Sequence, residues 1–191
     1  MSRAIAAFHG RFDRATLYQL NRPFNIHAHR EGHLIFHLGG ADGHVDLDGR
    51  LCPVTSETVL AVSPWEPHNF IPTDLETGAL FFVFYVDCEW FAPGGGAEKL
   101  CFGTPLIKRT RALDRQIRCA AATLSAGERL GELDGELRNL IDACYEESWR
   151  QTDQPAERRA LDGVTDFRVR KSIRLLQEAP VADIELDAVA R

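Results

Sequence analysis

The sequence predicts a mainly antiparallel β protein whose C-terminal half is helical. From about residue 12 to residue 91, short apolar runs alternate with polar residues at a period of two, which is typical of half-buried strands. After a Pro-Gly break at residues 93–96 the apolar spacing changes to three and four, which indicates helices. Because no helical pattern separates the strands, the first half favours an antiparallel sandwich or barrel.

At least five strands follow one another in the first half of the chain. Asp48-Gly49 lies between two of them and predicts a tight hairpin, since glycine readily adopts the positive φ that a two-residue turn requires. The five segments are Thr16–Leu20, Leu34–Leu38, His44–Leu47, Thr58–Val62 and Ala79–Val86.

Two helices follow, and they are joined near Gly127. The first is expected from the spacing of Ile107, Leu113, Ile117, Ala121 and Leu124. The second has a wide apolar stripe, which must pack either on the chain's own barrel or on a second copy of the chain. The stripe includes Leu133, Leu137, Leu140, Ile141 and Trp149.

The overall composition is that of a globular protein. The chain has 191 residues, 45% apolar and 26% charged, and a net charge of −6, so a disordered, collagen-like or membrane-spanning chain is not expected. Five widely spaced cysteines without a Cys-x-x-Cys pair do not suit a disulfide framework or a zinc ribbon. The N-terminus lacks the apolar run of a signal peptide, so we expect a cytoplasmic protein with reduced thiols.

The positive charge is concentrated near the C-terminus. Residues 157–174 contain six basic and three acidic residues, a local charge of +3, which leaves −9 for the rest of the chain. Residues 152–164 have no periodicity and resemble a linker. From residue 165 a third helix and the beginning of a fourth are expected, too little to enclose a core, so we expect this segment to continue beyond Arg191.

Six of the seven histidines lie between His27 and His68. His27, His29, His33 and His37 are all at odd positions, so an extended backbone would direct them to one face, where a closed barrel could bring them to His68. Neutral imidazoles that converge in this way suit a divalent transition metal, with His27, His29, His33 and His68 as ligands. The alternative is that they hydrogen-bond loops at the barrel mouth and bind nothing.

The pattern His27-x-His29, His33, Gly40 or Gly43, Asp48-Gly49 and Pro64-x-x-Pro67-His68 resembles the cupin fold. More narrowly, the order of barrel, helix pair, linker and basic helix resembles the AraC family of transcription regulators. The resemblance implies a cupin-like antiparallel β-barrel, or double-stranded β-helix, at 1–103 and a helical dimerisation region at 104–151. A linker at 152–164 and an incomplete helix-turn-helix domain at 165–191 would follow.

The resemblance further implies a ligand-sensing regulator that is a homodimer and is not an enzyme. A small-molecule effector would bind in the barrel, and DNA would be bound only through the domain that continues beyond Arg191. The implied effector-binding residues are Arg11, His29, His33, His37, Trp65 and His68, and the implied dimer contacts are Leu133, Leu137, Leu140, Ile141 and Trp149. No cofactor is required, although a divalent metal is possible.

A metal-dependent cupin enzyme, a dioxygenase or an isomerase, is the alternative. Metal-binding cupins carry a glutamate at the position of His33, so a metal here would depend on the four histidines. The sequence contains no Gly-x-Ser-x-Gly nucleophile motif and no phosphate-binding loop.

Overall fold

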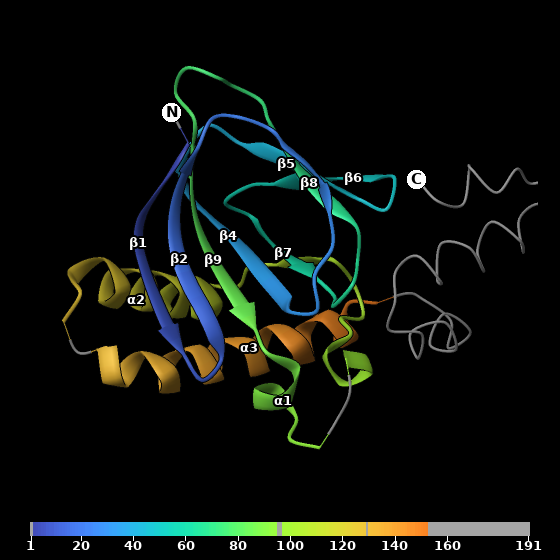
Figure 1. Ribbon diagram of the computed structural model, residues 1–191, viewed down its shortest axis with the longest axis vertical. Helices are drawn as coiled ribbons and strands as arrows, with labels where there is room; N and C mark the ends of the chain where they lie inside the picture. The colour runs from blue at the N-terminus through green and yellow to red at the C-terminus, as the bar shows by residue number, and fades with distance from the viewer. Residues whose placement is uncertain (1, 95–96, 129, 153–191) are drawn as a thin grey trace, which may run out of the picture.

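Two antiparallel sheets face each other and form an open-ended barrel, with two long helices against the outer side of the larger sheet (Figure 1). The computed structural model describes residues 2–94, 97–128 and 130–152. The larger sheet has the order β1-β2-β9-β4-β7-β10 and the smaller one β3-β8-β5-β6. The predicted fold class is confirmed.

The first half of the chain contains nine strands. They are β1 (Arg3–Gly10), β2 (Asp13–Leu20), β3 (Phe24–His27), β4 (Gly32–Gly40), β5 (Gly43–Leu47), β6 (Arg50–Val54), β7 (Thr58–Val62), β8 (His68–Pro72) and β9 (Ala79–Val86). The second half contains α1 (Cys88–Phe91), a short 3₁₀ turn at Ala97–Leu100, the edge strand β10 (Leu106–Lys108), α2 (Arg111–Ala126) and α3 (Leu130–Arg150).

The predicted strands and hairpin are present. All five segments expected from the alternation lie in β2, β4, β5, β7 and β9. Asp48 and Gly49 join β5 to β6 with φ of 48° and 86°, the paired positive φ values of a tight hairpin turn. The short loop therefore holds β5 and β6 in register at the edge of the smaller sheet.

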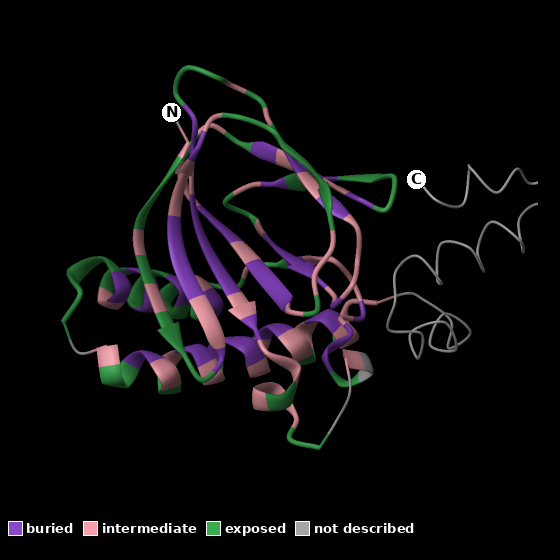
Figure 2. Ribbon diagram, in the orientation of Figure 1, coloured by how far each residue is buried: buried purple, intermediate pink, exposed green. Residues whose placement is uncertain are grey.

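Strand β9 is apolar on both faces because both faces are buried (Figure 2). Phe82 and Phe84 point to the helices and pack with the interior of α2 and α3. Phe81 and Val83 point the other way, into the space between the two sheets. The continuous apolar run at residues 79–86 is thus explained by a strand in the middle of three layers.

The two long helices complete the outer layer. The hydroxyl of Thr110 accepts a hydrogen bond from the backbone N–H of Leu113 and caps the start of α2, and Gly127 ends α2 with a φ of 68°. Ile107, assigned by its spacing to the first helix, instead lies in β10 and pairs with Val59. That part of the prediction is wrong because Ile107, about one turn before the start of α2, lies at a spacing that also fits a residue inside the helix.

The apolar stripe of α3 packs on the chain's own sheet. Leu133, Leu137, Leu140 and Ile141 each have no exposed surface, and they belong to the same apolar cluster as Phe36 and Phe84 of the sheet. Of the two expected partners, the barrel is the one that the structure shows for these four side chains. These four side chains are buried within the chain, whereas Trp149 at the end of the stripe is partly exposed, and the dimer itself stays a prediction.

The remaining predicted regions lie at the C-terminus. The expected linker, from residue 153 on, and the expected DNA-binding segment at 165–191 lie outside the described residues. Among the helices that the structure does describe, none combines the length and the apolar composition needed to cross a membrane.

Replacement of Leu140 by alanine tests the role of the stripe. We expect Leu140→Ala to lower the free energy of unfolding by roughly 2–5 kcal/mol, because it leaves a cavity between α3 and the sheet. Urea denaturation measures this loss, and Leu51→Ala, at a residue with 57% exposure, is the control. Unchanged stability together with a shift from dimer to monomer in sedimentation would contradict the packing described here.

Candidate functional site

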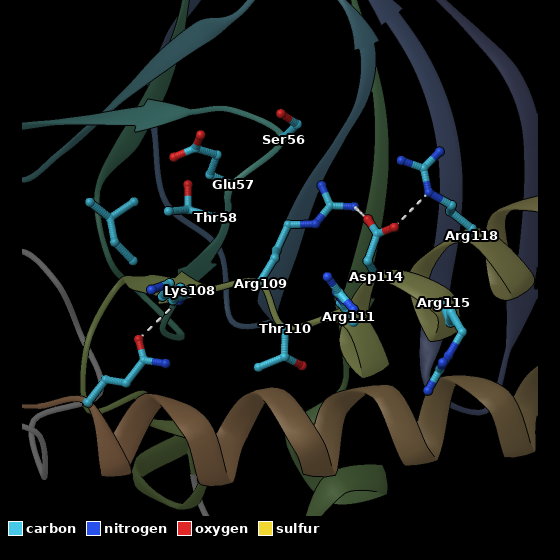
Figure 3. A pocket seen from close by; sticks show the side chains of 12 residues that line it. Ser56, Glu57, Thr58, Lys108, Arg109, Thr110, Arg111, Asp114, Arg115 and Arg118 are labelled. Carbon is cyan, nitrogen blue, oxygen red and sulfur yellow. Dashed lines mark hydrogen bonds and ion pairs between the residues drawn. The ribbon is translucent and has the colours of Figure 1, made fainter.

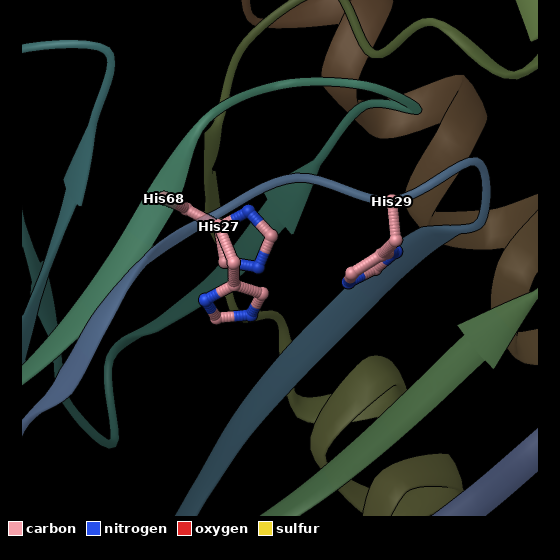
Figure 4. Close-up of side chains that lie close together, drawn as sticks. All are labelled: His27, His29 and His68. Atoms are coloured by element: carbon pink, nitrogen blue, oxygen red, sulfur yellow. The ribbon is translucent and has the colours of Figure 1, made fainter. Parts of the chain in front are cut away.

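Three histidines from different segments meet at one end of the barrel (Figure 4). His27 ends β3, His68 begins β8, and His29 lies in the loop between β3 and β4. One ring nitrogen of each lies within 4.8 Å of the others, a spacing that could hold a metal ion. His27 and His68 are directly opposite in the β3–β8 pair, with ring centroids 4.3 Å apart.

His29 is held in place through its own backbone. The N–H of Trp65 donates a hydrogen bond of 2.8 Å to the carbonyl oxygen of His29, which joins the β3–β4 loop to the β7–β8 loop. Trp65 has a φ of 62°, an uncommon conformation for a bulky residue. The turn at Trp65 therefore brings the loop that carries His29 next to the loop that leads into His68.

The second ring nitrogen of each histidine has an oxygen beside it. His27 Nδ1 lies 2.8 Å from the carbonyl oxygen of Asn25, and His68 Nδ1 lies 2.8 Å from that of Glu66. Because a carbonyl oxygen only accepts, both Nδ1 atoms carry the proton and both Nε2 atoms keep a free electron pair. His29 Nδ1 lies 3.4 Å from Glu31 Oε2, so a carboxylate takes the same place there. This outer arrangement of oxygens is typical of histidines that bind metals.

His33 lies beside the three histidines rather than among them. Its ring centroid is 5.0 Å from that of His29 and 4.7 Å from that of His68, but it is not part of the group of three. His33 has 3% exposure, and its Nδ1 has no hydrogen-bond partner within the described chain. His33 is thus a buried polar side chain on the inner side of the site.

Burial favours the neutral form of His29, His33 and His68. Removal from water lowers the pKa of His68 to about 4, and it lowers the pKa of His29 and, more strongly, of His33. The neighbouring histidines lower the pKa of His33 and His68 further. Metal ligation requires neutral imidazole, so at neutral pH protons compete weakly with a metal at this position.

A row of polar side chains crosses the inner face of the larger sheet next to the histidines. Arg14 on β2 lies opposite Tyr85 on β9, and Tyr85 lies opposite His33 on β4. The Arg14 guanidinium carbon is 4.2 Å from the centre of the Tyr85 ring, and the ring of His33 is 5.2 Å from it. Arg14 Nε has no hydrogen-bond partner among the described residues. The same is true of the hydroxyl of Thr16, which lies two residues farther along β2 and has 1% exposure.

These residues were missed in the sequence. Arg14, Thr16 and Tyr18 alternate with the apolar residues Ala15 and Leu17, so the period-two pattern alone would make them the outer, solvated face of β2. The helices cover the face with Ala15 and Leu17 instead, and the polar face of β2 points into the barrel.

The expected effector-binding residues do not all come together. His29, His33 and His68 do, and Trp65 contacts the same loops through its backbone. Arg11 lies exposed in the turn between β1 and β2. His37 is buried four residues farther along β4, where its Nε2 donates a 3.1 Å hydrogen bond to the carbonyl oxygen of Ala41. His37 faces the same way as His33, but the strand carries it away from the barrel mouth.

Compared with known proteins, the sequence matches no family model and no curated protein. Among solved structures, it is similar to a cupin superfamily protein from Desulfitobacterium hafniense, with a TM-score of 0.40, 12% identity and coverage of 46% of this chain and 79% of that chain. A putative mannose-6-phosphate isomerase from Ralstonia eutropha has a TM-score of 0.41, 11% identity and coverage of 46% and 86%. A predicted oxalate decarboxylase from Thermotoga maritima has a TM-score of 0.35, 16% identity and coverage of 40% and 67%.

These neighbours correct one expectation. The chain was expected not to be an enzyme, and the solved structures with a similar barrel include an isomerase and an oxalate decarboxylase by name. The expectation of no enzymatic activity is therefore withdrawn. At these levels of identity and coverage the neighbours do not assign a reaction to this chain.

The pKa of His68 predicts how stability depends on pH. In metal-free protein, the unfolded chain binds a proton at this residue below about pH 6.5, whereas the folded chain binds it only near pH 4. Stability should therefore fall as the pH is lowered from 6.5 to 4, by an amount on the order of 3 kcal/mol for this group.

Urea unfolding in EDTA across this range measures the effect. His68→Gln should flatten the profile, and His9→Gln, which removes an exposed histidine from β1, should not. Identical profiles for wild type and His68→Gln would show that His68 does not stay neutral in the folded chain.

Proposed function

We propose that the chain is a metal-dependent enzyme that holds a divalent transition metal at the barrel mouth and acts on a small anionic substrate. The observation that carries the proposal is the arrangement of His27, His29 and His68. Their ring nitrogens approach one another on the inner side, and an oxygen lies beside the Nδ1 of each ring. Three imidazole nitrogens within 4.8 Å of one another, contributed by two strands and a loop, are the kind of donor group that a transition metal binds.

The donor set fits such an ion. Both nitrogens of His29 are buried without a hydrogen bond within the described residues, which is costly unless something else satisfies them. Three imidazoles suit a borderline transition metal such as zinc, iron, manganese or nickel better than calcium or magnesium. A divalent ion bound by three side chains would supply Lewis-acid polarisation of a substrate oxygen at its open coordination positions.

The chain's own residues determine how the three ligands are oriented. The carbonyl oxygens of Asn25 and Glu66 fix the tautomers of His27 and His68. Glu31 Oε2 lies 3.4 Å from His29 Nδ1 without a hydrogen bond to it, and Arg30 Nε donates a 2.9 Å hydrogen bond to Glu31 Oε1. His27 and His68 are therefore preorganised, which reduces the free energy needed to order them on binding.

The proposal that the substrate is an anion rests on three hydrogen-bond donors beside the histidines, Arg14, Thr16 and Tyr85. An anionic oxygen beside the histidines would accept hydrogen bonds from the unpartnered Arg14 Nε and Thr16 hydroxyl. Burial raises the pKa of Tyr85, so its hydroxyl keeps its proton and can donate as well. A carboxylate fits this set of donors, and its other end would lie toward His29 and His33.

The ligand-sensing regulator remains a prediction. Its DNA-binding part would begin at residue 165, outside the described residues, and no contact of the described chain distinguishes an effector from a substrate. An effector pocket with a bound metal would also use the same histidines. The experiments below therefore test metal and anion binding before any reaction.

Metal content tests the histidine group directly. Protein dialysed against equimolar zinc, manganese, iron(II) and nickel should retain about one equivalent of one metal by elemental analysis. The double variant His27→Ala/His68→Ala should bind at least about 100-fold more weakly, because two of three ligands are gone. His9→Ala, an exposed histidine outside the group, is the control. Equal retention in the double variant would refute the proposed ligands.

Anion binding tests the role of Arg14. Malonate should bind to the wild type in calorimetry and its neutral diamide should not. Arg14→Gln should weaken malonate binding by about 10- to 100-fold, the usual effect of losing a charge-assisted hydrogen bond. Arg11→Gln removes the same charge three residues away in an exposed turn and should have no effect. Equal loss of affinity in both variants would mean that malonate binding depends on the net charge of the protein alone.

A further inference from the structure

A second polar site lies outside the barrel, at the edge of the larger sheet (Figure 3). It is an open pocket of about 1060 Å³ between the beginning of β7, the strand β10 and the first turns of α2. None of the histidines at the barrel mouth lines it. The pocket is large enough for a small organic molecule.

The lining is strongly basic in a chain that is acidic overall. Five of the lining side chains are basic and two are acidic, which leaves an excess of three positive charges, although the whole chain has a net charge of −6. The basic residues are Lys108, Arg109, Arg111, Arg115 and Arg118, and the acidic ones are Glu57 and Asp114. Such a concentration of one sign in a concave surface attracts an oppositely charged ligand.

Only part of this charge is neutralised within the described chain. Asp114 contacts Arg109 and also accepts a 2.8 Å hydrogen bond from Arg118 Nε, so one carboxylate serves two guanidinium groups. Arg111 and Arg115 are exposed on the same side of α2 and form no ion pair with another described residue. The two arginines are therefore free to bind an anion.

Two buried polar atoms of the lining also lack partners. Arg109 has 3% exposure, and its Nε has no hydrogen bond within the described residues. The hydroxyl of Thr58, on β7 opposite Lys108, is buried and unpaired in the same way. Buried donors without partners are unfavourable in a free protein, and an oxyanion would satisfy them.

We propose that this pocket binds a phosphate-bearing small molecule, such as a nucleotide. A phosphate has more negative charge than a carboxylate and matches the excess of positive charge, and arginine pairs with its oxygens in a bidentate manner. The hydroxyls of Ser56, Thr58 and Thr110 are additional donors in the lining. The pocket is larger than phosphate alone, and Leu106 supplies an apolar contact for the organic part of the ligand.

The pocket is connected to the histidine strand. Arg109 Nη1 donates a 2.7 Å hydrogen bond to the carbonyl oxygen of His37 on β4, the strand that begins at the barrel mouth with His33. A ligand that draws the Arg109 guanidinium toward itself would weaken that hydrogen bond. This hydrogen bond is a direct contact between the lining of the outer pocket and β4.

Calorimetry with ADP, and with adenosine as the uncharged probe, tests the proposal. The protein is kept metal-free with EDTA, so that the result does not depend on the histidine site. ADP should bind and adenosine should not. Arg111→Gln/Arg115→Gln should weaken ADP binding at least about 10-fold, because the two free guanidinium groups are removed.

Matched variants separate a site from a general effect of charge. Arg22→Gln/Arg50→Gln removes the same two charges at exposed arginines that do not line the pocket, and it should leave ADP affinity unchanged. Glu57→Gln removes a repelling carboxylate and should strengthen binding. Absence of ADP binding, equal losses in the two double variants, or equal affinity for adenosine and ADP would each overturn the proposal.

Discussion

The pairing of β9 with β2 on one side and β4 on the other is the constraint on which the molecule depends. Because β9 is buried on both faces, a shift of one residue would exchange its helix-facing and barrel-facing side chains. The same register sets Arg14, Tyr85 and His33 in one row across three strands. Packing of the core and geometry of the site are therefore two results of one hydrogen-bond ladder.

Much of the fold was predictable because its signals are local. Alternation predicted β2, β4, β5, β7 and β9 of the ten described strands, Asp48-Gly49 predicted a hairpin, and the spacing of leucines predicted α3. The site was predictable only in part. The cluster of histidines in the sequence pointed to the barrel mouth, but period-two counting placed His37 with them, although the length of β4 separates it from the rest. Which face of β2 points inward depends on where the helices dock, and no local pattern contains that information.

The two candidate sites differ in their electrostatics. At the barrel mouth, burial favours the uncharged form of His29, His33 and His68, and the charge of Arg14 also lowers the pKa of His29 and His33. In the outer pocket the charge is carried by arginines that remain ionised at any physiological pH. The first site would thus be sensitive to protons and metals, and the second to ionic strength. Strand β4 touches both, since its carbonyl at His37 binds Arg109.

The hydrogen bond from Trp65 to the backbone of His29 joins two loops through main-chain atoms alone. Both atoms belong to the main chain, so the hydrogen bond uses neither the indole nor the imidazole. The loops can therefore diverge in sequence while they keep their spacing. At the mouth of this barrel, a ligand would contact side chains, whereas main-chain atoms hold the two loops together. In evolutionary terms, ligand specificity can therefore change there while the scaffold is kept.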